Sequence, residues 1–332
     1  MKLIVPMAGR GTRVRPHSHV TPKPLLTVEG EPIVGRIVDL FHRVLDTPPD
    51  EGVFVLGPDF GQGIKDQLVE VCEKHDMDAH FTVQEEAHGT AHAVGCAGPH
   101  LEGDGIVVFA DTLFDMEASV DLTGSDVVVF TREVDDPSRF GVAVRDGEEV
   151  TRLVEKPDEP ISNEAIIGIY YVRDLGALQT EVESLIDAGQ RGKGGEYQLT
   201  DAFDRMLQDG KTFTTAGATA WMDCGTIPAL LDTTGKILER ESDDLRHGTT
   251  EDSVIREPVY VGPGAEIRGS VVGPHVSVEA GATIEQSVVS ESIVFQDAEV
   301  TDAVLAESVI GRSATVQQQS GTLNVGDHSR VE

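Results

Sequence analysis

Two patterns of apolar and polar positions divide the chain. Up to about residue 243, short apolar runs typical of buried strands alternate with amphipathic stretches typical of helices. The alternation predicts an α/β fold, with a largely parallel sheet, helices on both faces and ligands at the carboxyl ends of the strands. The predicted strands are Lys2–Met7, Val53–Gly57, Ala79–Gln84, Ile106–Ala110 and Asp126–Thr131, and the predicted helices are Ile33–Leu45, Gly61–His75 and Thr90–His100.

After Thr250, aliphatic residues recur in sets of three at steps of six. Each set fits one coil of a triangular solenoid, in which stacked coils bury apolar residues that one coil leaves exposed. Antiparallel hairpins also fit short stretches, but the spacing holds across four sets and favours a left-handed parallel β-helix. We therefore predict two domains, 1–243 and 251–332. The sets are Ile255-Val261-Ile267, Val272-Val278-Ile284, Val288-Val294-Val300 and Val304-Ile310-Val316.

The chain is strongly acidic, with 58 acidic and 26 basic residues spread along 332 positions. This balance argues against a nucleic-acid or anionic-membrane partner, because both require a basic face. An acidic surface on a folded protein suits a salt-rich cytoplasm, where salt screens like charges, so we predict a halophilic protein. The cysteines Cys72, Cys96 and Cys224 lack CxxC spacing, and no leader or membrane-length apolar run occurs. These features predict a cytoplasmic protein.

A glycine-rich turn after the first predicted strand is followed by two basic residues. The turn reads Ala8-Gly9-Arg10-Gly11-Thr12-Arg13, and Pro22-Lys23-Pro24-Leu25 follows it. Glycine allows backbone N–H groups to approach a phosphate closely, while Arg13 and Lys23 add positive charge. The spacing is that of neither a Walker A loop nor a dinucleotide fingerprint. An ordinary strand–turn connection is the alternative to a triphosphate-binding turn.

Two aspartates follow extended runs, Asp111 after residues 105–110 and Asp223 after Trp221-Met222. Mg²⁺ prefers one or two carboxylates together with phosphate oxygens and water, so the pair predicts a Mg²⁺ site. A helix N-cap or a turn is the alternative role for each acid.

Two further segments carry binding chemistry. Gln84 offers both a donor and an acceptor for the edge of a pyrimidine, and Gly89 lets a ring lie close to the backbone. Glu155 next to Lys156 could bind sugar hydroxyls and a phosphate. A plain strand–helix turn near Thr90 and a surface ion pair are the alternatives.

Taken together, Gly9-Arg10-Gly11-Thr12-Arg13-Val14-Arg15-Pro16 and Pro22-Lys23-Pro24-Leu25 resemble the motifs of the sugar-phosphate nucleotidyltransferases. The likeness is greatest to glucose-1-phosphate thymidylyltransferases that carry a carboxyl-terminal β-helix. It implies a Rossmann-like sheet of the nucleotide-diphospho-sugar transferase type and transfer of a nucleotide to a sugar 1-phosphate with Mg²⁺. It also implies a metal site at Asp111 and Asp223, which act in catalysis together with Arg13 and Lys23. The implied nucleotide-binding residues are Ala8, Gly9, Gly11, Thr12, Arg13, Lys23, Gln84, Gly89 and Thr90, and the implied sugar-phosphate residues are Gly141, Glu155, Lys156, Gly168 and Tyr170.

The chain departs from the family pattern at three places. It has Ala8-Gly9 where many relatives have Gly-Gly, Thr112 after the first metal ligand where many have Asn, and Gly194 where an Arg is common. Thymidine triphosphate with glucose 1-phosphate is the favoured substrate pair. UTP with glucose or N-acetylglucosamine 1-phosphate, a non-catalytic regulatory subunit and an acetyl-transferring β-helix are the alternatives. Exposed β-helix faces commonly associate, so we predict a homo-oligomer.

Overall fold

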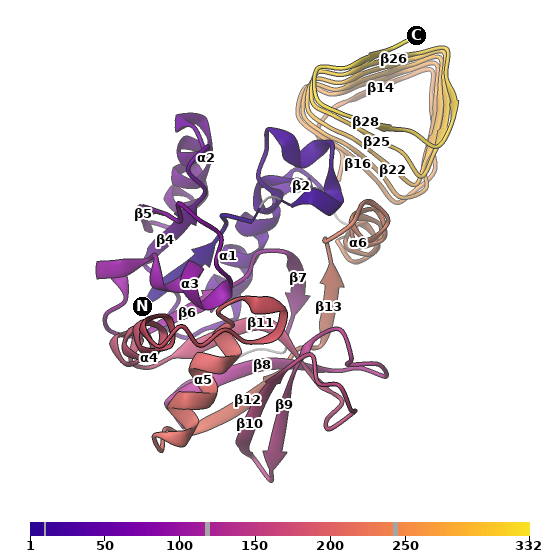
Figure 1. Cartoon of the computed structure of the whole chain (residues 1–332). Coiled ribbons are helices and arrows are strands. Elements are labelled where there is room, and N and C mark those ends of the chain that lie inside the picture. The colour runs from indigo at the N-terminus through magenta and orange to yellow at the C-terminus, as the bar shows by residue number, and fades with distance from the viewer. Residues whose placement is uncertain (10, 117–119, 242–244) are drawn as a thin grey trace. The chain divides into compact units, whose positions relative to one another are not determined.

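The computed structural model describes residues 1–9, 11–116, 120–241 and 245–332, which form two compact units. Unit 1 contains residues 1–9 and 37–221, and unit 2 contains residues 10–36 and 222–332 (Figure 1). The segment 10–36, with most of the glycine-rich motif, thus groups with the carboxyl-terminal part of the chain. Residue 243, where the first predicted domain ends, lies outside the described residues, and the two predicted domains stay predictions.

Unit 1 is built on a nine-stranded sheet with the strand order β5-β4-β1-β6-β11-β8-β12-β10-β9. The first four strands run parallel, whereas β11 is antiparallel to β6, β8 and β9, so the sheet is mixed. The five predicted strands all occur, with ends within two residues of those expected. The strands are β1 (Lys2–Pro6), β4 (Glu51–Leu56), β5 (Asp78–Val83), β6 (Gly105–Val108), β8 (Val127–Glu133), β9 (Gly141–Asp146), β10 (Glu149–Glu155), β11 (Glu164–Val172) and β12 (Phe213–Gly217).

Helices cover both faces of this sheet, as predicted. On one face, α3 (Thr90–Gly95), α4 (Leu175–Asp187) and α5 (Leu199–Gln208) share a core with the strands, where Val94, Leu178 and Phe203 pack with Ile4 (Figure 1). On the other face lies α2 (Gln62–Glu73), whose Cys72 sulfur approaches Gly52 of β4. Helix α3 is shorter than predicted, because Gly98, with a φ of 54°, starts the separate turn η4 (Gly98–His100).

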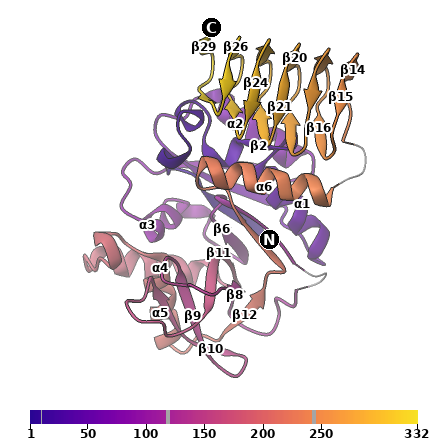
Figure 2. The same cartoon turned by 90° about the vertical axis from the view of Figure 1, so that its right-hand side faces the viewer.

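Unit 2 contains a triangular parallel β-helix, which confirms the predicted carboxyl-terminal fold (Figures 1 and 2). Its three sides are parallel sheets of six, five and five strands, and residues such as Val261, Ile267 and Val272 fill the interior. The sides are β14 (Thr249–Glu251), β17 (Glu266–Arg268), β20 (Thr283–Glu285), β23 (Glu299–Thr301), β26 (Thr315–Gln317) and β29 (Arg330–Val331); β15 (Val254–Ile255), β18 (Val271–Val272), β21 (Val288–Ser290), β24 (Val304–Ala306) and β27 (Ser320–Gly321); and β16 (Val259–Val261), β19 (Val276–Val278), β22 (Ser292–Val294), β25 (Val309–Ile310) and β28 (Asn324–Val325).

Two of the predicted inward residues are wrong by one position. Val288 and Val304 are 43% and 57% exposed, whereas their neighbours Val289 and Leu305 are buried. The step between equivalent strand positions is 17 residues from Val272 to Val289 and 16 residues from Val289 to Leu305. Because two apolar residues stand side by side at both places, the sequence pattern could not reveal this change of register.

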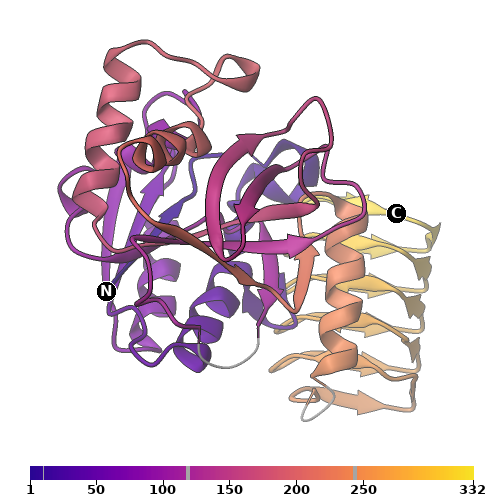
Figure 3. The same ribbon diagram turned by 90° about the horizontal axis from the view of Figure 1, so that it is seen from below.

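The rest of unit 2 packs against the β-helix. Helix α6 (Ile227–Arg240) lies along the coils, where Glu239 Oε1 is 2.9 Å from His275 Nε2 (Figures 2 and 3). The segment 10–36 contains the short helices η1 (Thr12–Val14), η2 (His17–His19) and η3 (Lys23–Leu25), the hairpin of β2 (Thr27–Val28) and β3 (Glu31–Pro32), and the start of α1 (Ile33–Val44). Among the described residues, none of the helices is long and apolar enough to cross a membrane.

Candidate functional site

The carboxyl ends of β1, β4 and β5 lie at one edge of the sheet in unit 1. The Met7 N–H donates to Val55 O (2.8 Å), and the Gln84 N–H donates to Leu56 O (2.8 Å). The glycine-rich turn and Gln84 therefore leave the sheet at the same edge. Gly57, which the sequence analysis missed, lies beside this turn, since a Cβ there would be 3.7 Å from Ala8 O.

Residues 84–90, which we call the Gln84 turn, connect β5 to α3. Gly89 has a φ of 117°, and a Cβ on it would lie 2.5 Å from Tyr197 O. The Tyr197 N–H donates to His88 O (2.9 Å), and the Leu199 N–H donates to Thr90 Oγ1 (2.9 Å). The start of α5 therefore fastens the turn, and only glycine fits at its closest point.

The side chain of Gln84 is buried and lies against His92. Its Nε2 is 2.8 Å from His92 Nδ1. Burial lowers the pKa of His92, with the nearby His88 acting in the same direction, so the neutral imidazole is favoured. Neutral Nδ1 can accept a hydrogen bond from the Gln84 amide, which fixes the orientation of the amide group.

Asp111 follows β6 and lies next to a bulge in β11. The Asp111 N–H donates to Phe109 O (2.8 Å), and the Phe109 N–H donates to Gly168 O (3.0 Å). Gly168 has a φ of 79°, and the pairing of β11 with β8 is irregular between Ile166 and Tyr170. The predicted metal ligand Asp111 and the predicted sugar residue Gly168 are therefore neighbours in unit 1, held by a glycine bulge.

The remaining predicted sugar-phosphate residues form one cluster on β9, β10 and β11. Gly141 pairs with Glu155, whose Oε2 would be 3.0 Å from a Cβ on the glycine. Lys156 Nζ lies 3.3 Å from Glu155 Oε1. Burial raises the pKa of the Tyr170 hydroxyl, and the charge of Glu155 raises it further, so this phenol stays protonated.

Two residues on α5, Thr200 and Asp201, adjoin this cluster and were not among the residues expected from the sequence. Thr200 Cγ2 would be 3.5 Å from a Cβ on Gly141. Its hydroxyl is buried and has no hydrogen-bond partner within the described part of the chain. Burial raises the pKa of Asp201, and the charges of Glu155 and Asp204 add to this effect. An unpartnered hydroxyl next to a carboxylate offers a hydrogen bond to a ligand.

In unit 2, the glycine-rich turn folds back on Lys23. Gly11 has a φ of 52°, and a Cβ on it would lie 3.3 Å from Lys23 Cβ. Ser18 Oγ donates to Gly11 O (2.7 Å). Lys23 is only 7% exposed, whereas Thr12 on η1 is exposed. The base of the buried Lys23 side chain is therefore held close to the turn.

Arg13 and Asp223 both lie next to Gly225, also in unit 2. The Gly225 N–H donates to Asp223 Oδ1 (2.7 Å), and a Cβ on Gly225 would be 3.4 Å from Arg13 Nη2. The Thr233 hydroxyl of α6 donates a hydrogen bond to Asp223 O (2.7 Å). The helix thereby fixes the backbone that presents the Asp223 carboxylate beside a guanidinium.

The two units divide the predicted residues between them. Unit 1 carries Asp111 and unit 2 carries Asp223, so their meeting at one Mg²⁺ stays a prediction. Their carboxylate oxygens are the donors that Mg²⁺ takes together with phosphate oxygens and water. Among the described residues, no group of three or more His, Cys, Asp or Glu is arranged to hold a metal ion. Unit 1 carries Ala8, Gly9, Gln84, Gly89, Thr90, Gly141, Glu155, Lys156, Gly168 and Tyr170, and unit 2 carries Gly11, Thr12, Arg13 and Lys23.

Comparison with known proteins identifies two matching families. The nucleotidyl transferase family matches residues 2–240, and the GlmU-like carboxyl-terminal hexapeptide family matches residues 235–320. A low-salt glycan biosynthesis nucleotidyltransferase of Haloferax volcanii is 27% identical over 369 residues and covers the whole of both chains. A glucose-1-phosphate thymidylyltransferase of Streptomyces antibioticus is 28% identical, over 100% of this chain and 99% of its own.

Two other similarities concern parts of the chain. The bifunctional protein GlmU of Methanococcus aeolicus is 28% identical over 81% of this chain, which spans 62% of that protein. A solved UDP-glucose pyrophosphorylase in complex with UDP-glucose has a TM-score of 0.59 at 20% identity, and covers 72% of this chain and 98% of its own. At this identity the structural likeness concerns the fold alone.

Proposed function

Because this chain belongs to the nucleotidyl transferase family, we propose that it joins thymidine triphosphate to glucose 1-phosphate and releases pyrophosphate. The observation that carries the proposal is that three candidate elements of unit 1 follow strands β1, β5 and β6 of the parallel part of the sheet: the start of the glycine-rich turn at Ala8-Gly9, the Gln84 turn and Asp111. A nucleotide bound at this edge would meet backbone N–H groups, a buried amide and a carboxylate. The full-length likeness to a thymidylyltransferase supports the thymidine nucleotide.

In the proposed reaction, a phosphate oxygen of the sugar 1-phosphate attacks the α-phosphorus of the nucleotide and pyrophosphate leaves in line. A phosphate monoester is mostly ionised at neutral pH, so the attack requires no general base. The main barrier is the repulsion between two anions, which the chain lowers by positioning them and by adding positive charge. Arg13 and Lys23 are assigned to the phosphates of the nucleotide, and Lys156 is assigned to the sugar phosphate.

Mg²⁺ is part of the proposal, with Asp111 and Asp223 as its protein ligands. Bound there, it would neutralise charge on the phosphate oxygens. The carboxylate of Asp223 is held by the Gly225 N–H, and the backbone of Asp111 is held by Phe109 O. Both carboxylates thus stand on fixed backbone, as a geometrically demanding ion requires.

The roles of the remaining residues follow from their contacts. Gln84, fixed by His92, would read the donor and acceptor edge of thymine, and Gly89 would let the base lie on the backbone. Glu155 would accept hydrogen bonds from sugar hydroxyls, and the unpartnered Thr200 hydroxyl lies beside the same cluster. Because uracil presents the same edge as thymine, UTP is the second candidate nucleotide, and the similarity to a uridylyltransferase of Haloferax volcanii favours it.

The test is pyrophosphate release by the purified chain with Mg²⁺, five nucleoside triphosphates, and glucose or N-acetylglucosamine 1-phosphate. We expect the highest kcat/KM with thymidine triphosphate and glucose 1-phosphate. Asp111→Ala and Lys23→Ala should each lower kcat by about a hundredfold or more. The matched controls Asp187→Ala and Lys211→Ala should keep kcat within about twofold. Release with none of the pairs would leave the non-catalytic regulatory subunit as the function.

Self-association through the β-helix belongs to the same proposal. Val254, Val271, Val288 and Val304 lie in register on one side of it. Three of them are 43–57% exposed, which is a large apolar stripe for so acidic a chain. Light scattering should show an oligomer that Val288→Lys with Val304→Lys converts to a monomer. A monomeric unsubstituted chain would contradict this part of the proposal.

The proposal places the protein in a salt-rich cytoplasm, on the ground of its net charge of −32.

A further inference from the structure

Residues 15–17, which follow the glycine-rich turn, pack against the later coils of the β-helix, all within unit 2. A Cβ on Gly326 would lie 3.0 Å from Pro16 Cβ. The rings of His17 and Phe295 lie next to each other at a tilt of 56°, with centroids 5.5 Å apart. His17 and Phe295 are 1% and 2% exposed, so this contact excludes water.

A polar contact fastens the same three residues to Asn324. His17 Nε2 lies 2.6 Å from Asn324 Oδ1, and Asn324 Nδ2 donates to Arg15 O (3.3 Å). Because Oδ1 can only accept, His17 donates from Nε2, and its buried Nδ1 has no partner within the described part of the chain. One asparagine of β28 therefore holds both a side chain and a backbone carbonyl within four residues of Arg13.

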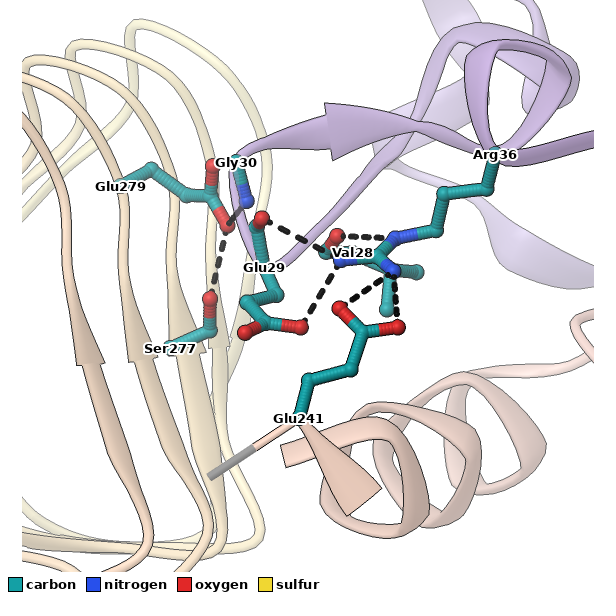
Figure 4. Close-up of polar contacts among 7 residues, drawn as sticks. All are labelled: Val28, Glu29, Gly30, Arg36, Glu241, Ser277 and Glu279. Carbon is teal, nitrogen blue, oxygen red and sulfur yellow. Dashed lines mark hydrogen bonds and ion pairs between the residues drawn. The ribbon is translucent and has the colours of Figure 1, made fainter. Parts of the chain in front are cut away.

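The hairpin of β2 and β3 makes a second contact with the β-helix (Figure 4). The Gly30 N–H donates to Glu279 Oε1 (3.2 Å), which also accepts from Ser277 Oγ (2.8 Å). Gly30 has a φ of 77°, and a Cβ on it would overlap the hydroxyl of Tyr260. Only glycine therefore lets the hairpin tip sit on this side of the coils.

Arg36 ties the other end of the segment to α6. Its Nη2 is 2.8 Å from Glu29 Oε2, and its Nη1 is 3.0 Å from both carboxylate oxygens of Glu241 (Figure 4). Its Nε also donates to Val28 O (2.8 Å). The Arg36 side chain is 12% exposed and that of Glu29 is 5% exposed, whereas Glu241 is half exposed, so the contact with Glu29 is the one shielded from water.

Around the contact with Asn324, the described residues 11–26 form three short 3₁₀-helices and no strand. Without a sheet ladder of its own, such a segment depends on its contacts for its conformation. We infer that the β-helix positions residues 11–23, which carry Arg13 and Lys23. Asn324 is the positioning residue for these two side chains. The inference rests on the proposed function, in which these two side chains contact the nucleotide phosphates. It assigns the β-helix a part in the transfer reaction itself.

The test uses the full chain with Asn324→Ala, and Gln317→Ala on β26 as the matched control. Kinetics over a range of nucleotide concentrations should show kcat lowered about tenfold. The KM for the nucleotide should change less than about threefold, because a misplaced charge acts chiefly in the transition state. The melting temperature should fall by no more than about 4 °C. Hydrogen exchange should speed up in residues 11–23 and stay unchanged in the sheet of unit 1. The control should match the unsubstituted chain in all three measurements.

A double-mutant cycle tests whether His17 and Asn324 act through one contact. His17→Ala combined with Asn324→Ala should lower kcat about as much as either alone, because the second change finds the contact already broken. Additive losses, or an unchanged kcat and exchange rate in Asn324→Ala, would overturn the inference. Hydrogen exchange decides it even for a chain that turns over none of the tested nucleotides, whereas the absence of turnover counts only against the proposed function.

Discussion

Replacement of Gly89 by alanine should destabilise unit 1 far more than the same change at a glycine in open space. Gly89 has a φ of 117° and a ψ of 178°, a backbone region that only glycine occupies readily. A Cβ there would be 2.5 Å from Tyr197 O, 2.7 Å from Tyr197 N and 2.9 Å from Glu196 Cβ. The methyl group therefore meets backbone atoms, which cannot rotate aside as a flexible side chain can.

The size of the effect follows from these contacts. The backbone strain costs about 1–3 kcal/mol. Relief of the overlap moves Tyr197 away from His88 and Ala91, which loosens two backbone hydrogen bonds worth about 1 kcal/mol each. The free energy of unfolding should fall by about 3–5 kcal/mol in total. At about 2–4 °C per kcal/mol, this lowers the melting temperature of unit 1 by roughly 6–20 °C.

The assay is thermal unfolding followed by circular dichroism, with Gly210→Ala as the control. Gly210, after α5, has a φ of 84° but nothing within 4 Å of the position of a Cβ. Alanine there bears only the left-handed backbone cost of about 1–2 kcal/mol. If Gly89→Ala melts no lower than Gly210→Ala, the backbone at Tyr197 moves away from the methyl group at little cost. The argument that Tyr197 fastens the Gln84 turn would then be wrong.

Three other predictions concern stability. Burial lowers the pKa of His17 below the ordinary histidine value of about 6.5, so unfolding binds a proton and stability is lost as the pH falls below about 6.5. The melting temperature of His17→Gln should therefore drop less between pH 7.5 and 5.5 than that of the unsubstituted chain, and an equal drop would refute this. Thr200→Val removes the unpartnered buried hydroxyl, so differential scanning calorimetry should show a melting point equal or a few degrees higher, whereas a fall would mean that the hydroxyl is bonded. The net charge of −32 predicts a melting point that rises between low and molar potassium chloride; one indifferent to salt would contradict it.

Much of the architecture was predictable from local patterns. Five strands and three helices before residue 132 were predicted from their own apolar patterns, and each coil of the β-helix repeats its inward residues, so the class of both folds follows from short stretches of sequence. The register was not predictable where Val288 stands next to Val289, because either residue could fill the interior. The antiparallel half of the sheet also escaped prediction, since strand direction depends on the path of the chain between strands.

The sequence by itself determined which residues are candidates for the chemistry: a glycine-rich turn, Arg13, Lys23 and the acids at 111 and 223 were all proposed from residue type and order. Only the tertiary structure decided which of them lie together. Asn324 reaches His17 across 307 positions, and Thr200 lies beside Gly141, although neither pair has any local signal. Local periodicity reports which face of an element is buried, whereas the partner on that face is chosen by how distant elements pack. For that reason the docking of residues 15–36 on the β-helix and α6 became visible only in the folded chain.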